Sequence, residues 1–210
     1  MPERETDARL IDEILSVLLG ASCAGCDEPG RVLCDGCREL LRAVPAQRVL
    51  TGGLSATAAL SFEGVAARCI RAVKEEGSTL LVRPLAAALH EALPSDPEAL
   101  LVPVPTSRAS FRRRGYRVPE MLVRACGRRT ARLLAHAGGT EDQRGLGRAA
   151  RERNVAGSMR ARHLGSGEEV VLVDDVITTG STLVEAAEVL SEAGFRVRGA
   201  VALAATPKRR

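Results

Sequence analysis

Apolar residues along this chain occur in two patterns, helical spacing and short continuous runs. Apolar positions three or four residues apart predict helices, and short runs rich in β-branched side chains predict strands. The pattern predicts helices over residues 5–19, 65–77, 79–93, 119–137 and 182–193, and strands over 54–62, 100–102, 170–173 and 195–204. Strand and helix alternate through the last two thirds of the chain, which predicts an α/β fold with a mostly parallel sheet.

The predicted strand at 170–173 is followed by polar residues that point to a ligand. In open α/β sheets, ligands bind beyond the carboxyl ends of the strands, and Asp174 and Asp175 stand at that end. Two carboxylates there can accept hydrogen bonds from a vicinal diol, such as that of a ribose. The next helix begins with free N–H groups that favour a phosphate, and hydroxyl side chains surround its start. The pattern predicts a ribose 5-phosphate site in which the phosphate lies at Thr178, Thr179, Gly180, Ser181 and Thr182.

Other nucleotide-binding motifs are missing from the sequence. There is no G-x-x-x-x-G-K-[ST] and no G-x-G-x-x-G after a predicted strand, so neither a Walker P-loop nor a dinucleotide fingerprint is present. A simple helix cap, with Thr182 and Glu185 as a capping box, is the alternative interpretation of the loop. Capping requires neither two aspartates nor five small polar residues in a row.

Four cysteines near the N-terminus form two C-x-x-C pairs. Cys23, Cys26, Cys34 and Cys37 have the spacing with which four thiolates converge on one Zn²⁺ ion. A site with four protein ligands is closed, so we expect the zinc to be structural. Disulfides would require an oxidising compartment, and a redox C-x-x-C would usually occur once. Cys69 and Cys126 stand alone on predicted helices and are expected in the core.

The length and the apolar content of the chain limit which classes of protein it can belong to. The 210 residues suggest one domain with a small appendage. No apolar run is long enough to span a membrane, and the charged N-terminus has no signal-peptide pattern, so we expect a cytoplasmic protein without membrane insertion.

Residues 108–162 contain 15 arginines and 4 acidic residues, although the whole chain has a net charge of only +4. This clustering suggests a polyanionic partner; a codon bias toward arginine is the alternative, but it does not explain the clustering.

Residues 170–182, VVLVDDVITTGST, resemble the phosphoribosyl-pyrophosphate (PRPP) signature of type I phosphoribosyltransferases. The segments LVPVPTSRASFRRRGYR and QRGLGRAARERNVAGSM, together with the four cysteines, are similar to the ComF family. Members of that family carry a zinc ribbon ahead of a phosphoribosyltransferase domain and are associated with competence for DNA uptake in some bacteria. The resemblance covers nearly the whole chain and implies a cysteine element at 1–45 and a transferase-type domain at 46–210.

The resemblance also implies roles for particular residues. Asp174 and Asp175 would hold the ribose hydroxyls, and residues 178–182 the 5-phosphate. The pyrophosphate loop would be Pro105, Thr106, Ser107 and Arg108, and residues 112–155 would include a lid. Mg²⁺ would bridge pyrophosphate and diol, because it prefers phosphate oxygens.

The sequence departs from the family pattern at three places. Arg117-Val118 stands where Asn-Gln is usual, Lys74-Glu75-Glu76-Gly77 where Lys-Tyr-x-Gly is usual, and Met159 where Phe is usual. Two hypotheses remain open. The first is a transferase that moves ribose 5-phosphate from PRPP to an unidentified nitrogenous base. The second is a non-catalytic PRPP- or nucleotide-binding protein that supports DNA uptake or repair and contacts single-stranded DNA or the uptake machinery through its basic surface.

Arginines and the single tyrosine of the basic segment have more than one interpretation. Arg112, Arg113 and Arg114 can clamp pyrophosphate or DNA phosphates, or form a solvated basic face. Tyr116 can stack on a base, but a lone tyrosine of this kind more often packs against its own loop.

Overall fold

A computed structural model of the chain describes residues 22–137 and 157–207. Its centre is a five-stranded sheet with the strand order β1-β2-β7-β6-β3. Strands β2, β7, β6 and β3 are parallel, and β1 pairs antiparallel with β2 at one edge. The strands are β1 (Ala46–Val49), β2 (Ser55–Ser61), β3 (Leu100–Pro103), β6 (Glu169–Ile177) and β7 (Arg196–Ala205). The predicted α/β architecture with a mostly parallel sheet is therefore confirmed.

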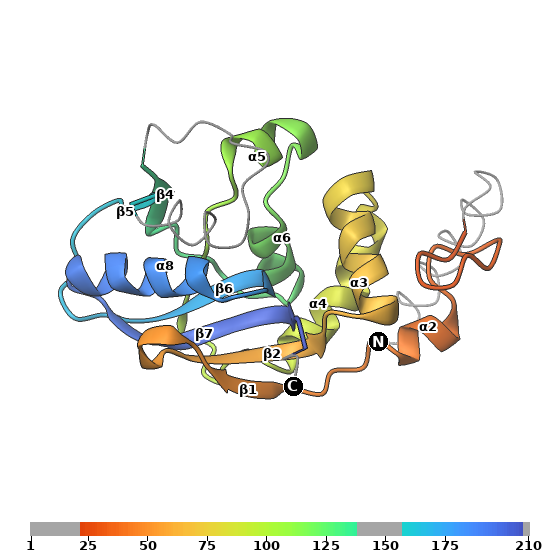
Figure 1. Ribbon diagram of the computed structural model, residues 1–210, viewed down its shortest axis with the longest axis horizontal. Helices are drawn as coiled ribbons and strands as arrows, with labels where there is room; N and C mark the ends of the chain where they lie inside the picture. The colour runs from red at the N-terminus through yellow and green to blue at the C-terminus, as the bar shows by residue number, and fades with distance from the viewer. Residues whose placement is uncertain (1–21, 138–156, 208–210) are drawn as a thin grey trace.

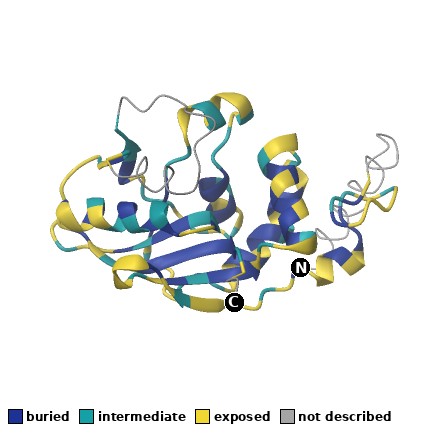
Figure 2. Ribbon diagram, viewed as in Figure 1, coloured by how far each residue is buried: buried dark blue, intermediate teal, exposed yellow. Residues whose placement is uncertain are grey.

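Helices cover both faces of this sheet (Figure 1). Helix α8 (Ser181–Glu192) packs on β6 and β7, and α4 (Val82–His90) contacts β2 and β7 from the other face together with α6 (Val118–Ala125). Successive strand residues face opposite sides, so the two sides have separate hydrophobic clusters. Leu172 and Ala202 belong to the cluster on the α8 side, whereas Val173 and Leu203 belong to the cluster under α4 and α6. The strands are mostly buried and the outer faces of the helices are exposed (Figure 2).

The cysteine-rich segment belongs to the second of these clusters. It contains the short helix α2 (Asp35–Glu39). Cys23, Leu33 and Leu41 are buried in the same cluster as α3 (Gly64–Arg71) and α4. Burial of these apolar side chains ties the segment to the α/β core.

The structure differs from the prediction at two places between residues 108 and 137. The predicted helix 119–137 is wrong beyond residue 125, because α6 ends before Gly127, whose φ of 73° is left-handed. The chain then forms β4 (Leu134–His136), which pairs antiparallel with β5 (Met159–Ala161). Residues 108–117, where the pattern predicts neither helix nor strand, contain helix α5 (Arg108–Arg114), which stops before Gly115.

Elsewhere the predicted elements agree with the structure and differ mainly in length. The predicted helix 65–77 is α3 followed by a π-helical turn, Ala72–Glu76, and the helix at 79–93 is a 3₁₀ turn, Thr79–Leu81, followed by α4. The strand predicted at 170–173 continues to Ile177, because pairing with β7 persists to that residue. The predicted helix 5–19 and residues 138–155 of the predicted lid lie outside the described residues. None of the helices in the described ranges is long and apolar enough to cross a membrane.

Candidate ligand site at the carboxyl end of the sheet

Asp174 and Asp175 lie inside β6, just beyond the point where its neighbour β3 ends. The last β3 pair is Pro103 with Val173, whereas β7 still pairs with Asp174 through Ala202. Asp174 and Asp175 therefore stand where one side of β6 is free of a strand partner. Because strand side chains alternate, Asp174 follows Leu172 to the α8 side and Asp175 follows Val173 to the α4 and α6 side. The two carboxylates share one strand end but have different surroundings.

The surroundings give the two carboxylates different electrostatics. Asp174 Oδ1 accepts a hydrogen bond from the backbone N–H of Asp175 at 2.8 Å. Burial, and then the negative charge of Asp175, raises the pKa of Asp174 to about 7, although that hydrogen bond and Lys74 act in the opposite direction. Asp175 has a cationic partner of its own, because Lys74 Nζ donates to Asp175 Oδ1 at 3.0 Å.

Lys74 joins the site although nothing in the sequence pattern assigned it a role. It lies in the π-helical turn after α3 and is 101 residues away from Asp175 in the chain. Two observations could have drawn attention to it: it is one of only two lysines, and it stands at a place where the family pattern also has a lysine. Its contact with Asp175 depends on the packing of α3 beside the sheet, which periodicity does not reveal.

The loop from Thr178 to Thr182 connects β6 to α8. Gly180 precedes the helix with a φ of 85° and has no side chain with which to cap it, and the Thr179 hydroxyl accepts a hydrogen bond from Ser181 N at 3.3 Å. The alternative interpretation, a capping box of Thr182 and Glu185, is wrong. Glu185 instead accepts hydrogen bonds from Ser158 and Met159 of the β5 region. The N–H groups at the start of α8 and the Thr179 and Ser181 hydroxyls, 2.9 Å apart, therefore lie together at the end of the strand.

Leu50 and Thr206 hold this loop from the sides. A Cβ atom on Gly180 would approach Leu50 Cδ2 to 2.7 Å, so only glycine fits there without displacement. The backbone N–H of Thr206 donates to Ile177 O at 2.9 Å, and its hydroxyl donates to Thr178 O at 3.1 Å. The loop is thus confined by two residues that follow other strands, Leu50 after β1 and Thr206 after β7.

The predicted pyrophosphate loop, Pro105–Arg108, follows β3 at the same edge of the sheet. Val104 N donates to Val173 O at 2.9 Å, which places the start of this loop directly beside Asp174 in the neighbouring strand. Ser107 Oγ accepts from Ser110 N at 3.2 Å and caps α5. Arg108 is exposed and has no ion pair within the described ranges. The structure therefore brings the three predicted groups, residues 105–108, 174–175 and 178–182, to one end of the sheet.

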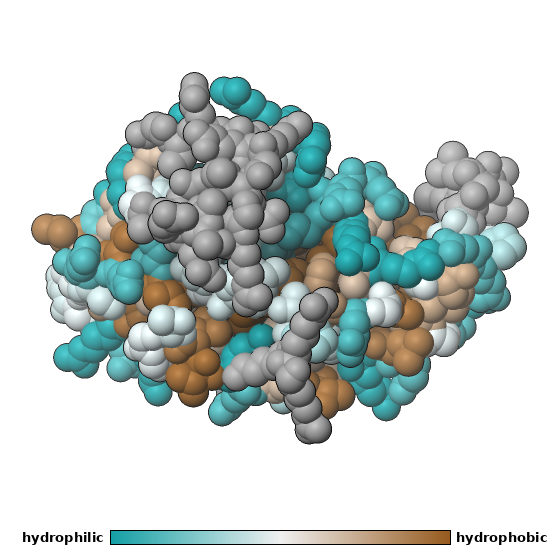
Figure 3. Space-filling model, viewed as in Figure 1, coloured by the Kyte–Doolittle hydropathy of each residue, from teal (hydrophilic) through white to brown (hydrophobic). Residues whose placement is uncertain are grey.

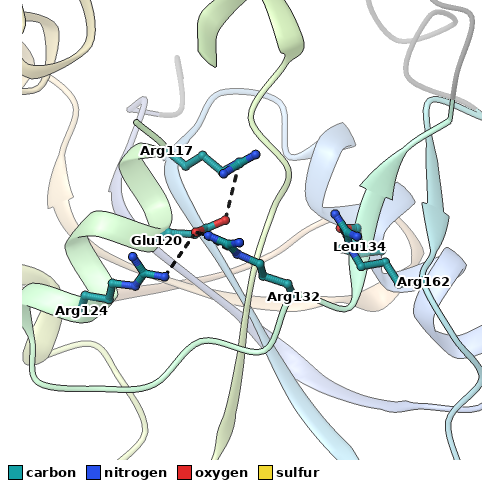
Figure 4. A network of polar contacts seen from close by, with 6 residues as sticks. All are labelled: Arg117, Glu120, Arg124, Arg132, Leu134 and Arg162. Atoms are coloured by element: carbon teal, nitrogen blue, oxygen red, sulfur yellow. Dashed lines mark hydrogen bonds and ion pairs between the residues drawn. The ribbon is translucent and has the colours of Figure 1, made fainter. Parts of the chain in front are cut away.

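Several arginines of the basic segment bind the protein itself. Buried Glu120 of α6 receives two hydrogen bonds from Arg132, at 3.1 and 2.6 Å, and lies within 4.0 Å of Arg117 and Arg124. Figure 4 shows these three guanidinium groups around one carboxylate. Arg162, nearby, donates to Leu134 O at 3.1 Å. This part of the basic segment stabilises the connection between α6 and the β4–β5 ribbon, and it keeps an excess of positive charge.

Other arginines remain at the surface. Arg112 and Arg113 of α5 are exposed and form no hydrogen bond or ion pair with the residues that the structure describes. Hydrophilic side chains accordingly dominate the surface over α5 (Figure 3). The predicted lid is described only as far as residue 137, and Arg144, Arg148, Arg151 and Arg153 lie outside the described residues.

The four cysteines Cys23, Cys26, Cys34 and Cys37 converge on one point. Their Sγ atoms all lie within 4.8 Å of one another, and Sγ atoms around a tetrahedral Zn²⁺ would be about 3.8 Å apart for Zn–S bonds of about 2.3 Å. Gly25 is required here, because a Cβ atom would approach Cys37 Sγ to 2.5 Å.

The electrostatics of the cysteines also suit a cation. Burial raises the pKa of the Cys23 thiol, but hydrogen bonds from the backbone of Cys34 and neighbouring residues outweigh it and lower the pKa to about 6. Burial, followed by hydrogen bonds with the other cysteines, raises the pKa of Cys37. Four thiols packed this closely cannot all ionise without a cation between them, so the donor set fits zinc.

Comparisons with known proteins agree with this architecture. The family model described as the phosphoribosyl transferase domain matches residues 128–210, a range that includes β6, the loop 178–182 and α8. No curated protein matches the chain. The predicted fold class, a mostly parallel sheet flanked by helices with a four-cysteine cluster ahead of it, is confirmed, and its C-terminal part, residues 128–210, matches the phosphoribosyl transferase domain.

Three solved structures are similar to the chain. The orotate phosphoribosyltransferase from Aeropyrum pernix is 18% identical with a TM-score of 0.36, and the similarity covers 79% of this chain and 76% of that chain. The Leishmania donovani UMP synthase is 17% identical with a TM-score of 0.37, covering 80% of this chain and 30% of that one. The adenine phosphoribosyltransferase from Leishmania tarentolae is 20% identical with a TM-score of 0.34, covering 62% of this chain and 60% of that one.

Proposed function

We propose that this protein binds PRPP and transfers its ribose 5-phosphate to a nitrogenous base, releasing pyrophosphate. The observation that supports this most is the shared location of two carboxylates, the start of helix α8 and the Pro105–Arg108 loop at one end of the sheet. Diol, 5-phosphate and pyrophosphate are the three polar parts of PRPP. Each has a partner of suitable chemistry there.

In the proposed complex, Asp174 and Asp175 accept hydrogen bonds from the ribose hydroxyls. The hydroxyls of Thr178, Thr179, Ser181 and Thr182 and the first N–H groups of α8 bind the 5-phosphate. Main-chain groups of Pro105–Arg108 bind the pyrophosphate. Mg²⁺, when bound with PRPP at this end of the sheet, would offset the negative charge of the leaving pyrophosphate.

The proposed reaction needs no nucleophile from the protein. The bond between ribose C1 and the pyrophosphate oxygen breaks and a bond from C1 to the base nitrogen forms, while the nitrogen loses its proton to solvent or to the departing pyrophosphate. Positive charge develops on the ribose ring as pyrophosphate leaves. The protein contributes position and electrostatic stabilisation, and the carboxylates at the end of β6 lie beside this developing charge.

The finer assignments are part of the same proposal. We propose that Cys23, Cys26, Cys34 and Cys37 hold one structural Zn²⁺ ion, and that the protein is a cytoplasmic member of the ComF family. The combination of four converging thiols with a transferase-type domain supports this assignment.

A turnover assay tests the function. The protein is incubated with PRPP, Mg²⁺ and each of a panel of nucleobases, and pyrophosphate release is measured. We expect release that depends on one base and is abolished in the double variant Asp174→Ala, Asp175→Ala. PRPP with Mg²⁺ should also raise the melting temperature, since a ligand that binds only the folded state stabilises it.

The same assay separates the two hypotheses. Thermal stabilisation by PRPP without turnover for any base, together with tight binding of single-stranded DNA, would favour the non-catalytic alternative. The exposed Arg112 and Arg113 and the excess charge around Glu120 are the features that favour this second candidate. Absence of any thermal shift at saturating PRPP with Mg²⁺ would contradict PRPP binding and with it the transferase hypothesis.

A further inference from the structure

The π-helical turn Ala72–Glu76 presents Lys74 to the ribose-binding end of β6. It continues α3 and ends at Gly77, whose φ is 77°. Such turns are rare and occur often at functional sites. Asp175 has 13% of its side chain exposed and Lys74 has 32%, so their 3.0 Å contact is largely withdrawn from water. A charge pair in such surroundings interacts more strongly than one at the surface.

Two side chains from one short segment bind the last carbonyl groups of this turn. Arg114 Nη1 donates to Lys74 O at 3.1 Å, and the Tyr116 hydroxyl donates to Val73 O. The final carbonyl groups of a helix have no partner within it, so these contacts satisfy acceptors that the turn leaves free. Gly115, between the two, has a φ of 79°, which lets the chain reverse so that both neighbours reach the same turn.

The same segment follows the proposed pyrophosphate loop. Ser107 caps the start of α5, and Arg114 is the last residue of that helix. The pyrophosphate loop is therefore connected through one short helix to the residues that hold Lys74.

We propose that Arg114 and Tyr116 are positioning residues, which hold Lys74 against Asp175 by binding the backbone carbonyls of Lys74 and Val73. Lys74 in turn orients the Asp175 carboxylate and balances its charge before a ligand arrives. The proposal rests on the proposed function, since it assigns to Asp175 the diol of PRPP. It also makes a statement about the unliganded protein, which can be tested without PRPP.

The composition of the chain makes Lys74 easy to observe. Lys74 and Lys208 are the only lysines, and Tyr116 is the only tyrosine in a chain without tryptophan. With Lys208 replaced by arginine, ¹⁵N-lysine labelling yields one side-chain amine signal, that of Lys74. Tyr116→Phe removes one hydroxyl, and we expect it to shift and broaden this signal in the unliganded protein.

Binding measurements then test whether the effect reaches the site. We expect Tyr116→Phe to weaken PRPP–Mg²⁺ binding about fivefold, the size of one lost hydrogen bond, and Arg114→Met to weaken it at least as much. Arg128→Met is the matched control, because Arg128 also donates to main-chain carbonyls, those of Pro94 and Asp96, but away from β6. It should leave both the Lys74 signal and the affinity unchanged.

A double-mutant cycle distinguishes positioning from a general structural effect. Lys74→Met should weaken binding, and Tyr116→Phe should then have no further effect in that background. Lys74→Arg keeps the charge and should restore part of the affinity. An equal loss from Tyr116→Phe with and without Lys74, or an unchanged Lys74 signal in Tyr116→Phe, would overturn the proposal. If the unmodified protein does not bind PRPP, the proposed function fails, while the Lys74 signal still decides whether Tyr116 holds the turn.

Discussion

Neighbouring residues on β6 show how strongly local surroundings act on identical side chains. Asp175 has a lysine partner at 3.0 Å, whereas the half-buried Asp174 has a pKa raised to about 7 by desolvation and then by the charge of Asp175. Asp174 therefore changes its protonation near neutral pH. If the ribose diol requires ionised Asp174, PRPP binding should weaken as the pH falls below about 7.

Replacing Asp174 by asparagine should stabilise the protein at neutral pH. The folded-state pKa of Asp174 lies above the ordinary value of 3.8, so protonated Asp174 favours the folded state at low pH and this contribution is lost as the pH rises through about 7. We expect Asp174→Asn to raise the free energy of unfolding by about 2–4 kcal/mol at pH 8 and by less at pH 5. Urea unfolding across this pH range measures it.

A control on the same strand makes that result specific. Glu169→Gln changes an exposed carboxylate whose partner is Arg198, and it should change stability little at either pH. Equal stabilisation by Asp174→Asn at pH 5 and pH 8 would contradict the raised pKa.

Gly180 tests the geometry of the predicted phosphate loop. Gly180→Ala introduces strain at a φ of 85° and a clash with Leu50, so we expect a loss of about 2–4 kcal/mol in unfolding free energy and weaker PRPP binding. Gly52→Ala is the matched variant: its φ is 75°, but a Cβ atom meets nothing within 4 Å. It should cost only about 1–2 kcal/mol and leave PRPP affinity unchanged. A smaller loss for Gly180→Ala than for Gly52→Ala would show that Leu50 does not confine the loop.

At the scale of helices and strands, single buried side chains connect elements that no local sequence pattern predicts to be neighbours. Glu185 on α8 is 7% exposed and accepts from Ser158 N at 2.6 Å, Ser158 Oγ at 2.8 Å and Met159 N at 3.1 Å. It joins the start of β5 to the helix that opens at the predicted phosphate loop. Glu120 does the same for α6 and the segment that leads to β4.

Removal of Glu185 should loosen the ribbon from α8. Glu185→Ala leaves buried N–H groups without acceptors, and we expect a loss of about 2–3 kcal/mol in unfolding free energy. Amide hydrogen exchange should become faster at Ser158 and Met159 in particular. Glu188→Ala, an exposed position on the same helix, is the control and should change neither quantity. Unchanged exchange at Met159 in Glu185→Ala would contradict this role.

Over the whole molecule, the cysteine element is attached to the α/β core through α3. Arg68 of that helix donates to Ala24 O at 3.1 Å and forms an ion pair with Asp27, and Cys69 beside it is buried in the same cluster as Cys23 and Cys37. The cysteine element and the sheet should therefore unfold together.

Metal analysis tests the proposed zinc. We expect about one Zn per chain, and chelation should lower the melting temperature in a single transition, because metal binding to such a site contributes folding free energy. Cys26→Ser, which removes the exposed ligand, should lower both zinc content and melting temperature. Cys126→Ser, outside the cluster, should retain the zinc. A folded, metal-free protein in which all four thiols react freely would exclude the zinc site.

Local chemistry allowed a correct prediction of the parallel sheet, the glycine-containing loop before α8 and the grouping of the four cysteines, whereas β6 continues past its predicted end at Val173 to Ile177. The residues responsible are neighbours in the chain, and their spacing alone limits what they can form. The site residues stay predictions until a ligand is tested. The helix predicted at residues 126–137 was wrong, because α6 ends before Gly127 and residues 134–136 pair with the distant strand β5.

Only the tertiary structure decided how the strand end is completed. Lys74 reaches Asp175 across 101 residues, Tyr116 reaches Val73 across 43, and Glu185 reaches Ser158 across 27. The two residues of each pair lie in different elements, so neither helical nor strand periodicity relates them. Each contact arises because helices and loops pack against the sheet. By itself, the sequence determined which residues stand at the carboxyl end of β6. Long-range packing decided which charges they meet there.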